Sequence, residues 1–229
     1  ASSDEEEAAA IEKQDVLQNC VGWYKTVCQG TKKPYAQQWQ VLLEMHTRTV
    51  FEEKKQSLFS STTSAIYADI LQDWMNRAEL SEVPMNAVPL FRLIHGLPGS
   101  GKSKIIEWMR SYWTSVWDYA EHVHFQFVAP LNTMAANIGG ETIHSWGNID
   151  FKNAQGLFCS MQNQASEVSK MEVRLQKMKF LVVDEVEAVG AVLLHDLEDT
   201  IRRHSRSEHK YIATNELPDG AQLSASASS

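Results

Sequence analysis

One eight-residue string constrains the fold of this chain more than any other feature. Residues 96–103 read Gly-Leu-Pro-Gly-Ser-Gly-Lys-Ser, which has the form G-x-x-x-x-G-K-S, and they lie between the apolar run 90–95 and a helix-like stretch, 102–116. A glycine loop between a strand and a helix binds phosphate, because successive backbone N–H groups converge on it and the helix N-terminus adds its positive dipole end. The string therefore predicts a nucleoside triphosphate site.

Each position of the loop has an expected role. Glycines allow backbone conformations and close approaches that a Cβ atom prevents. Lys102 is expected to reach the β- and γ-phosphates, and the Ser103 hydroxyl to bind Mg²⁺. The predicted nucleotide-binding residues of the loop are Gly96, Leu97, Pro98, Gly99, Ser100, Gly101, Lys102 and Ser103. The alternative is a glycine-rich turn that only resembles the motif, and the flanking strand and helix weigh against it.

A second motif follows later in the chain. The apolar string Phe-Leu-Val-Val at residues 180–183 ends in Asp184 and Glu185. An enzyme with such a loop needs an acid at the tip of a neighbouring strand to hold Mg²⁺, and Asp184 fits that role. Glu185 is the candidate general base for an attacking water, with Lys102 as the second catalytic residue. Many strands end in a solvated acid, but in combination with the loop the pair favours hydrolysis of ATP with Mg²⁺ as cofactor.

Composition narrows the class of protein. With 229 residues, 43% hydrophobic and 22% charged, the chain is long enough for one α/β domain with appended helices. A net charge of −8 disfavours a protein that mainly coats nucleic acid, although it leaves room for a local basic groove. The three cysteines form neither a metal-ligand spacing nor a disulfide framework, which favours an intracellular protein.

Neither a membrane span nor a signal segment is visible, so no membrane partner is expected. Because the chain begins with Ala rather than Met, we expect a processed product or a fragment.

Hydrophobic periodicity predicts the order of the elements. Helices are expected over residues 11–29, 37–55, 65–80, 102–116, 132–137, 166–178 and 187–203, strands over 90–95, 122–129 and 179–184, and an extended segment over 141–146. Strands that alternate with helices imply parallel βαβ units. The predicted fold is thus an α/β P-loop NTPase domain with a central parallel sheet flanked by helices, preceded by a helical segment.

Four regions are expected along the chain. They are an acidic tail and helix (1–33, with 1–10 disordered), a helical segment (34–88), the ATPase domain (89–205) and a disordered tail (206–229).

The string between the two motifs carries a family resemblance. Residues 128–146 read Val-Ala-Pro-Leu-Asn-Thr-Met-Ala-Ala-Asn-Ile-Gly-Gly-Glu-Thr-Ile-His-Ser-Trp. This resembles motif Ia and the following Gly-Gly-x-Thr-Ile-His-Ser element of the PIF (petite integration frequency) family of superfamily-one DNA helicases, as does Leu-Val-Val-Asp-Glu-Val at residues 181–186. The resemblance covers about half the chain, residues 91–203, and implies that residues 89–205 are the first RecA-like domain of such an enzyme.

The resemblance implies a partner, single-stranded DNA. By this likeness Thr133, Thr142, His144 and Ser145 would donate hydrogen bonds to DNA phosphates, and Trp146 would stack on a base. The alternatives stay open for each side chain: Thr142 as a strand residue, His144 as the cap of a turn and Trp146 as core. The likeness also implies DNA repair, recombination or telomere maintenance in the nucleus or mitochondrion.

Helicases of this type also carry a glutamine upstream of the loop that reads adenine. Gln-Gln-Trp-Gln-Val-Leu at residues 37–42 is similar to that motif, and Gln38 is best placed by its spacing. A glutamine on a helix surface is an equally good interpretation, because the stretch from Gln38 to Gly96 is longer than the family pattern.

The chain departs from the family after its second motif. The element Gly-Asp-x-x-Gln-Leu-Pro-Pro is not found where the sequence reads Ala-Thr-Asn-Glu-Leu-Pro at residues 213–218, and no second motor domain is expected within residues 1–229. The prediction is therefore the ATP-binding domain of a PIF-like DNA helicase that translocates 5′ to 3′ in its full-length form. The alternatives are a non-catalytic nucleotide-binding remnant or interaction module and, less favoured, another P-loop enzyme such as a small-molecule kinase.

Overall fold

The computed structural model describes residues 2–60, 64–84, 92–94, 99–149 and 164–205. The chain divides into two compact units, Ala1–Phe125 and Gln126–Ser229, which we call unit 1 and unit 2 and describe separately. The division falls inside residues 89–205, the span that the sequence predicts as a single ATPase domain.

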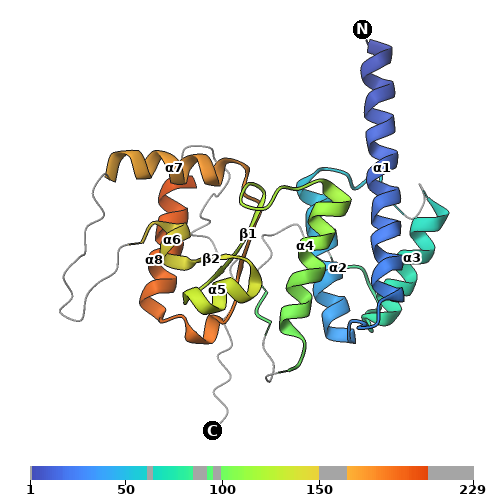
Figure 1. Ribbon diagram of the computed structural model, residues 1–229. Helices are drawn as coiled ribbons and strands as arrows, with labels where there is room; N and C mark the ends of the chain where they lie inside the picture. Colours follow the sequence, from blue (N-terminus) through green and yellow to red (C-terminus); the bar gives the residue numbers. More distant parts are fainter. Residues whose placement is uncertain (1, 61–63, 85–91, 95–98, 150–163, 206–229) are drawn as a thin grey trace, which may run out of the picture. The chain divides into compact units, whose positions relative to one another are not determined.

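Unit 1 is a group of helices, drawn from blue to green in Figure 1. Its elements are α1 (Ser2–Gln29), α2 (Ala36–Glu52), α3 (Ala65–Arg77) and α4 (Lys102–Trp117). The Ser64 hydroxyl accepts a hydrogen bond from the Tyr67 N–H and so begins α3, because a Ser side chain satisfies one of the free N–H groups of the first turn. Asp118, in the left-handed conformation, ends α4.

Aromatic side chains fill the core of unit 1. Trp74 and Trp113 are fully buried, and the Trp74 indole N–H donates to the Trp39 carbonyl oxygen over 3.1 Å. The Trp39 and Trp74 rings meet edge to face at 5.9 Å between centroids. Such pairs add about 0.5–1.5 kcal/mol to the burial of their large apolar area.

A buried polar cluster lies within this aromatic core. His46 of α2 is fully buried, with Nδ1 2.5 Å from the Tyr112 hydroxyl of α4 and Nε2 2.9 Å from the Tyr67 hydroxyl of α3. Burial lowers the pKa of His46 to about 3 and raises the pKa values of both tyrosines. The Cys20 thiol is 3.9 Å from His46 Nδ1, and burial raises its pKa to about 12. A neutral imidazole thus connects three helices.

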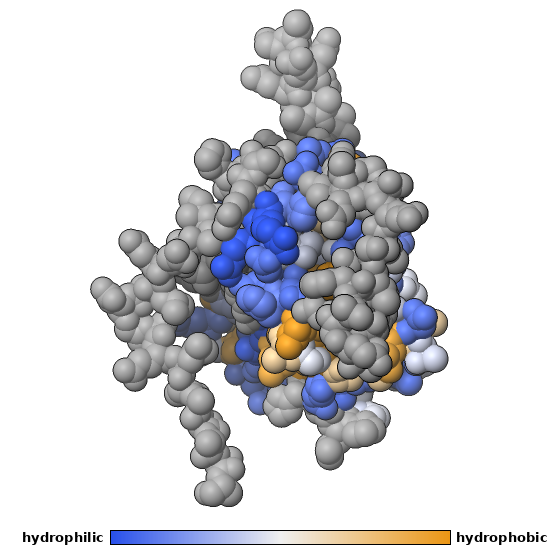
Figure 2. All heavy atoms as spheres, turned by 90° about the vertical axis from the view of Figure 1, so that its left-hand side faces the viewer, coloured by the Kyte–Doolittle hydropathy of each residue, from blue (hydrophilic) through white to orange (hydrophobic). Residues whose placement is uncertain are grey.

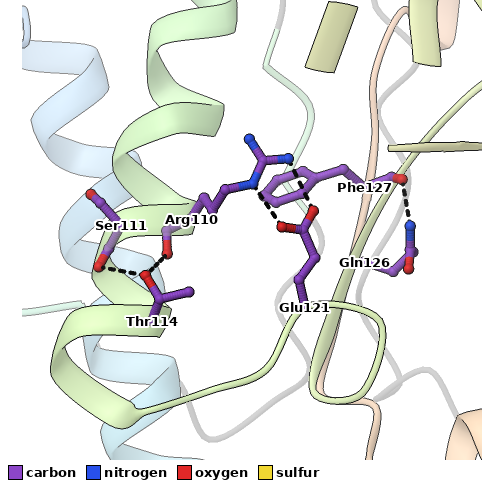
Figure 3. A network of polar contacts seen from close by, with 6 residues as sticks. All are labelled: Arg110, Ser111, Thr114, Glu121, Gln126 and Phe127. Atoms are coloured by element: carbon purple, nitrogen blue, oxygen red, sulfur yellow. Dashed lines mark hydrogen bonds and ion pairs between the residues drawn. The ribbon is translucent and has the colours of Figure 1, made fainter. Parts of the chain in front are cut away.

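An ion pair connects α4 to the turn that precedes the first strand. Arg110 forms a two-pronged ion pair with Glu121, at 2.9 Å from Nε and 3.0 Å from Nη2 (Figure 3). The Thr114 hydroxyl donates to the carbonyl oxygens of Arg110 and Ser111 along the same helix. Because a bidentate Arg–carboxylate pair fixes orientation as well as distance, it holds this turn against α4.

Unit 2 is built on a small sheet with helices around it (Figure 1). Its strands are β1 (Phe125–Ala129, which begins at the last residue of unit 1), β2 (Glu141–Thr142) and β3 (Phe180–Val183), in the order β2-β1-β3. Strands β1 and β2 pair in parallel, with Val128 opposite Glu141 and Ala129 opposite Thr142. The helices are α5 (Asn132–Ile138), α6 (Ile143–Gly147), α7 (Gln164–Lys177), the 3₁₀ turn η1 (Val186–Ala188) and α8 (Ala191–Ser205). The predicted α/β class is confirmed.

The core of unit 2 lies where the helices meet the sheet. Its buried members are Val128, Ile143, Trp146, Met171, Leu175, Met178 and Leu197. All of β1 is buried, whereas every residue of β3 is half-buried. Figure 2, viewed from the left-hand side of Figure 1, shows hydrophobic atoms exposed beside a larger hydrophilic area. Large hydrophobic side chains that unit 2 exposes include Leu131, Val173, Val192 and Leu194.

Several predicted boundaries need correction. Helix α1 begins at Ser2, not residue 11, which agrees with strong helix formers at positions 8–10 and with acids near the N-terminal dipole end. Strand β1 begins at Phe125 rather than at residue 122, because His122 has a φ of 68° and its N–H closes a turn onto Phe125.

Three further segments differ from the prediction. The extended segment 141–146 is only a two-residue strand, after which α6 begins. The helix predicted over 187–203 is interrupted before α8 at Ala191. The strand predicted over 90–95 lies partly outside the described residues, and its described part, 92–94, is not a strand.

Among the described helices, none has the length and apolarity of a membrane span.

Candidate functional site

The described part of the glycine loop has the backbone that the motif predicts. Gly99 and Gly101 have φ values of 82° and 86°, in the left-handed region where glycine is favoured. Gly101 precedes α4, and its carbonyl oxygen accepts from the Lys104 N–H over 3.0 Å. Lys102 and Ser103 therefore occupy the first turn of a 16-residue helix, where free N–H groups and the dipole favour an anion. The predicted site residues Gly96, Leu97 and Pro98 lie outside the described residues.

Gln38 lies against this loop. Its Nε2 atom is 3.4 Å from the Ser100 carbonyl oxygen and 3.3 Å from the Gly101 carbonyl oxygen, across 62 and 63 positions of sequence. The side chain is only 7% exposed, so the interpretation as a surface glutamine is wrong. A Cβ atom on Gly101 would lie 2.9 Å from Nε2, which shows how tightly the amide fits. The structure thus brings together two predicted nucleotide-binding elements.

The other end of the same amide organises the start of α2. Gln38 Oε1 accepts from the Tyr35 N–H over 2.9 Å, as a glutamine at the third helical position does in a capping box. Tyr35, the N-terminal partner of this contact, is not among the predicted site residues and is 68% exposed. Its position directly after Pro34 and three residues before Gln38 is the signal that was available.

The acid pair belongs to unit 2 and is positioned by backbone. Asp184 follows β3, is half-buried, and its N–H donates to the Val128 carbonyl oxygen of β1 over 2.8 Å. Glu185 is exposed, with φ at 50°, and its carbonyl oxygen accepts from the Ala188 N–H in η1. A left-handed backbone at a residue other than glycine stores strain, and such strain is common at functional sites. Both carboxylates thus follow the carboxyl end of a strand, where α/β sheets bind ligands.

The predicted DNA-binding residues lie on two short helices of unit 2. Thr133 is exposed on α5. The Thr142 hydroxyl accepts from the Ser145 N–H over 3.2 Å and so begins α6, which brings Thr142, His144 and Ser145 together at one helix start. Burial lowers the pKa of His144, and the nearby Asp196 carboxylate opposes this shift. Helix capping explains the threonine, while DNA contact stays a prediction for all four residues.

Core packing and turn geometry account for other residues of segment 128–146. Trp146 is 1% exposed and lies in the unit 2 core, so the core interpretation is correct and the ring is not available to a base. Gly139 has a φ of 62° and ends α5, while a Cβ atom on Gly140 would lie 2.3 Å from the Phe127 carbonyl oxygen. The glycine pair is therefore required by the turn into β2.

A groove with a volume of about 820 Å³ lies elsewhere in unit 1, between α1 and α4. Trp23, Lys32, Lys104 and Trp108 are among its lining residues, but Gln38 and residues 99–103 are not. The described parts of the chain hold no group of three or more His, Cys, Asp or Glu residues placed to bind a metal ion. Mg²⁺ on a phosphate needs only one or two protein ligands, so the absence of such a group does not test the predicted Mg²⁺ ligands Ser103 and Asp184.

Comparisons of the chain with protein-family models, with curated proteins and with solved structures found no match.

Proposed function

We propose that this chain binds ATP and Mg²⁺ through the glycine loop and is the RecA-like ATPase domain of a DNA helicase similar to the PIF family. In the full-length enzyme, ATP hydrolysis would drive 5′ to 3′ movement along single-stranded DNA and opening of the duplex. One observation carries the proposal: the Gln38 amide lies against the Ser100 and Gly101 carbonyl oxygens. The resemblance assigns this glutamine and this loop to the same nucleotide, and they are in contact although distant in sequence.

The chemistry of the loop supports triphosphate binding. Two left-handed glycines turn the chain into α4, whose first N–H groups and dipole attract phosphate oxygens. Lys102 adds a positive charge in the first turn, and Ser103 adds a hydroxyl of the kind that binds Mg²⁺. The Gln38 contacts, at 3.3 and 3.4 Å, are long, so they exchange at low cost for hydrogen bonds to adenine.

Asp184 and Glu185 are the proposed hydrolytic pair. Bound Mg²⁺ would neutralise charge on the phosphates, and Asp184 would hold it through water. Glu185 would accept a proton from the attacking water, and its exposed carboxylate is free of any described hydrogen bond that would compete for that proton. Thr133, Thr142, His144 and Ser145 are the proposed contacts to DNA phosphates.

Titration calorimetry with ATP in the presence of Mg²⁺ tests the nucleotide site. We expect binding by the wild-type chain, its loss in Lys102→Ala and a weaker interaction in Gln38→Ala. Lys104→Ala is the matched control, because Lys104 lies on the same helix and pairs with Glu107 rather than with the loop. Absence of Mg²⁺-dependent ATP binding by the wild-type chain would refute the proposal.

A second function, nucleotide binding without turnover, is favoured by one observation. Residues 213–218 do not supply the family's Gly-Asp-x-x-Gln-Leu-Pro-Pro element. A steady-state ATPase assay with and without single-stranded DNA separates the two functions. DNA-stimulated turnover that is lost in Glu185→Gln and retained in Glu187→Gln, an exposed neighbour in η1, supports the helicase domain. Binding with no turnover under either condition supports the non-catalytic function.

A further inference from the structure

Tyr35 is an exposed aromatic residue in a rigid position. Its side chain is 68% exposed, the largest fraction among the large hydrophobic residues that the structure describes. The backbone around it is fixed on both sides: its N–H donates to Gln38 Oε1 over 2.9 Å, and its carbonyl oxygen accepts from the Trp39 N–H over 2.9 Å. Its φ and ψ are −76° and 168°, the extended conformation of a residue that precedes a helix. The backbone that carries this largely exposed ring is therefore fixed by hydrogen bonds.

The position of this ring is linked to the glycine loop. The Gln38 amide that binds the Tyr35 N–H also contacts the Ser100 and Gly101 carbonyl oxygens. The Gln38 side chain thus bridges the Tyr35 backbone and the loop residues that directly precede α4. In a nucleotide with its phosphates at the first turn of α4, the ribose sets the base apart from the phosphates, so the residue that holds the base is expected beside the loop rather than in it, where Tyr35 lies.

We propose that the Tyr35 ring is the stacking surface for the base of the nucleotide that the loop binds. This inference rests on the proposed function and adds to it the residue that holds the base. A purine needs a flat apolar partner for its face, and an aromatic ring supplies one for any base. Stacking on an exposed, pre-positioned ring costs little ordering entropy, because the backbone at Tyr35 is already fixed.

Other aromatic residues near the loop fit this role less well. Trp108, on α4, is only 7% exposed and has the Lys104 ammonium 5.8 Å from its ring centroid. Phe51 is 40% exposed but lies at the far end of α2, beside the Arg48 guanidinium. Tyr35 combines exposure with a hydrogen-bonded path to the loop.

Calorimetry with two ligands, ATP and inorganic triphosphate, each with Mg²⁺, tests the inference. Loss of base stacking predicts that Tyr35→Ala weakens ATP binding about 5- to 100-fold and leaves triphosphate binding unchanged. Tyr35→Phe and Tyr35→Trp are expected to retain ATP affinity, because they keep the ring face. Phe51→Ala, an exposed aromatic on the same helix, is expected to bind both ligands as the wild type does.

The outcomes separate the inference from the proposed function. If Tyr35→Ala binds ATP as tightly as the wild type, or loses affinity for ATP and triphosphate equally, the stacking role is overturned while the nucleotide site stands. If the wild-type chain binds neither ligand, the proposed function fails and the inference fails with it. Far-ultraviolet circular dichroism of each variant verifies that the helices are intact, as expected for a largely exposed side chain.

Discussion

The two units hold their candidate site residues in different ways. In unit 1, the 7%-exposed Gln38 touches the loop with its side chain, and fully buried His46 lies two turns further along the same helix. In unit 2, half-buried Asp184 and exposed Glu185 are positioned by backbone hydrogen bonds and by a left-handed φ. Replacing a side chain at the unit 1 site therefore disturbs packing, whereas replacing the acids of unit 2 leaves their backbone in place.

This difference between the units predicts which substitutions change stability and which change activity. Helices α2 and α4 carry both the loop contacts and the aromatic core, so stability and nucleotide affinity are expected to change together in unit 1. Substitution of the exposed Glu185 is expected to change chemistry with little effect on stability, since exposed substitutions usually stay within about 0.5 kcal/mol. Four predictions test this contrast, in order of decreasing expected effect.

The largest effect is expected for Trp74→Ala. Trp74 is fully buried, donates to the Trp39 carbonyl oxygen and lies 5.2 Å from the His46 ring centroid. Deleting a buried indole leaves a cavity, which costs about 3–5 kcal/mol of unfolding free energy. Denaturant unfolding measures the loss, and hydrogen exchange is expected to speed up in α2 and α4.

Trp146→Ala is the matched control for Trp74→Ala in unit 2. Trp146 is also buried, so a similar loss of stability is expected, with faster exchange in the helices of unit 2. If Trp146→Ala speeds hydrogen exchange in α2 and α4 as much as Trp74→Ala does, the expectation that each substitution acts within its own unit is wrong.

The next effect is an acid sensitivity that comes from His46. Burial lowers the pKa of His46 in the folded chain to about 3, while an unfolded histidine titrates near 6.5. The unfolded chain therefore binds the extra proton first as pH falls, so stability declines between pH 6.5 and about 3. One such group contributes a slope of about 1.4 kcal/mol per pH unit.

Unfolding free energies of the wild type and His46→Gln, measured between pH 7 and pH 4.5, isolate this slope. The variant is expected to be less stable at pH 7, because the Tyr67 and Tyr112 hydroxyls lose an ideal partner, but to depend less on pH. His195→Gln, at an exposed position of α8, is expected to retain the wild-type slope. Identical slopes in all three proteins would show that His46 does not carry the effect.

Local patterns in the sequence predicted much of the fold. Helices α2, α3, α4, α5 and α7 lie close to the predicted ranges, because their apolar residues repeat at helical spacing. Segment 141–146 does not follow its predicted extended conformation beyond the two residues of β2. The Thr142 hydroxyl instead caps Ser145, and this local hydrogen bond begins a helix.

The candidate site was predictable only in part. The glycine conformations follow from the motif, since only glycine adopts φ values near 85° without cost. The contact of Gln38 with the loop depends on packing across 62 positions of sequence, which no local pattern encodes. The sequence alone therefore does not decide between a nucleotide-binding and a surface role for Gln38. The same holds for Tyr35, because its exposure is a property of the folded chain.

A smaller effect is expected for Gly140→Ala in unit 2. Its Cβ atom would lie 2.3 Å from the Phe127 carbonyl oxygen, and backbone atoms cannot move aside as a flexible side chain can. The strain is expected to cost about 1–3 kcal/mol, since overpacking in a close contact has that magnitude. Gly147→Ala is the control, because its Cβ atom would meet the Ile149 side chain at 3.0 Å and this side chain is able to rotate. Denaturant unfolding is expected to rank Gly140→Ala below Gly147→Ala in stability.

The smallest expected effect concerns two glycines of the loop. Substitution of Gly99 changes only the backbone conformation, whereas substitution of Gly101 also disturbs the contact with Gln38. Gly99→Ala and Gly101→Ala both force a Cβ onto a left-handed backbone, which costs about 1–2 kcal/mol. A Cβ atom on Gly99 would meet no described residue within 4 Å, whereas one on Gly101 would lie 2.9 Å from Gln38 Nε2 and displace the amide. We expect Gly101→Ala to lower ATP affinity more than Gly99→Ala, and Gln38→Ala to add little to Gly101→Ala because the same contact is already lost. Full additivity of Gln38→Ala with Gly101→Ala in calorimetry would contradict a role for this contact, and additivity of Gln38→Ala with Gly99→Ala is the internal control.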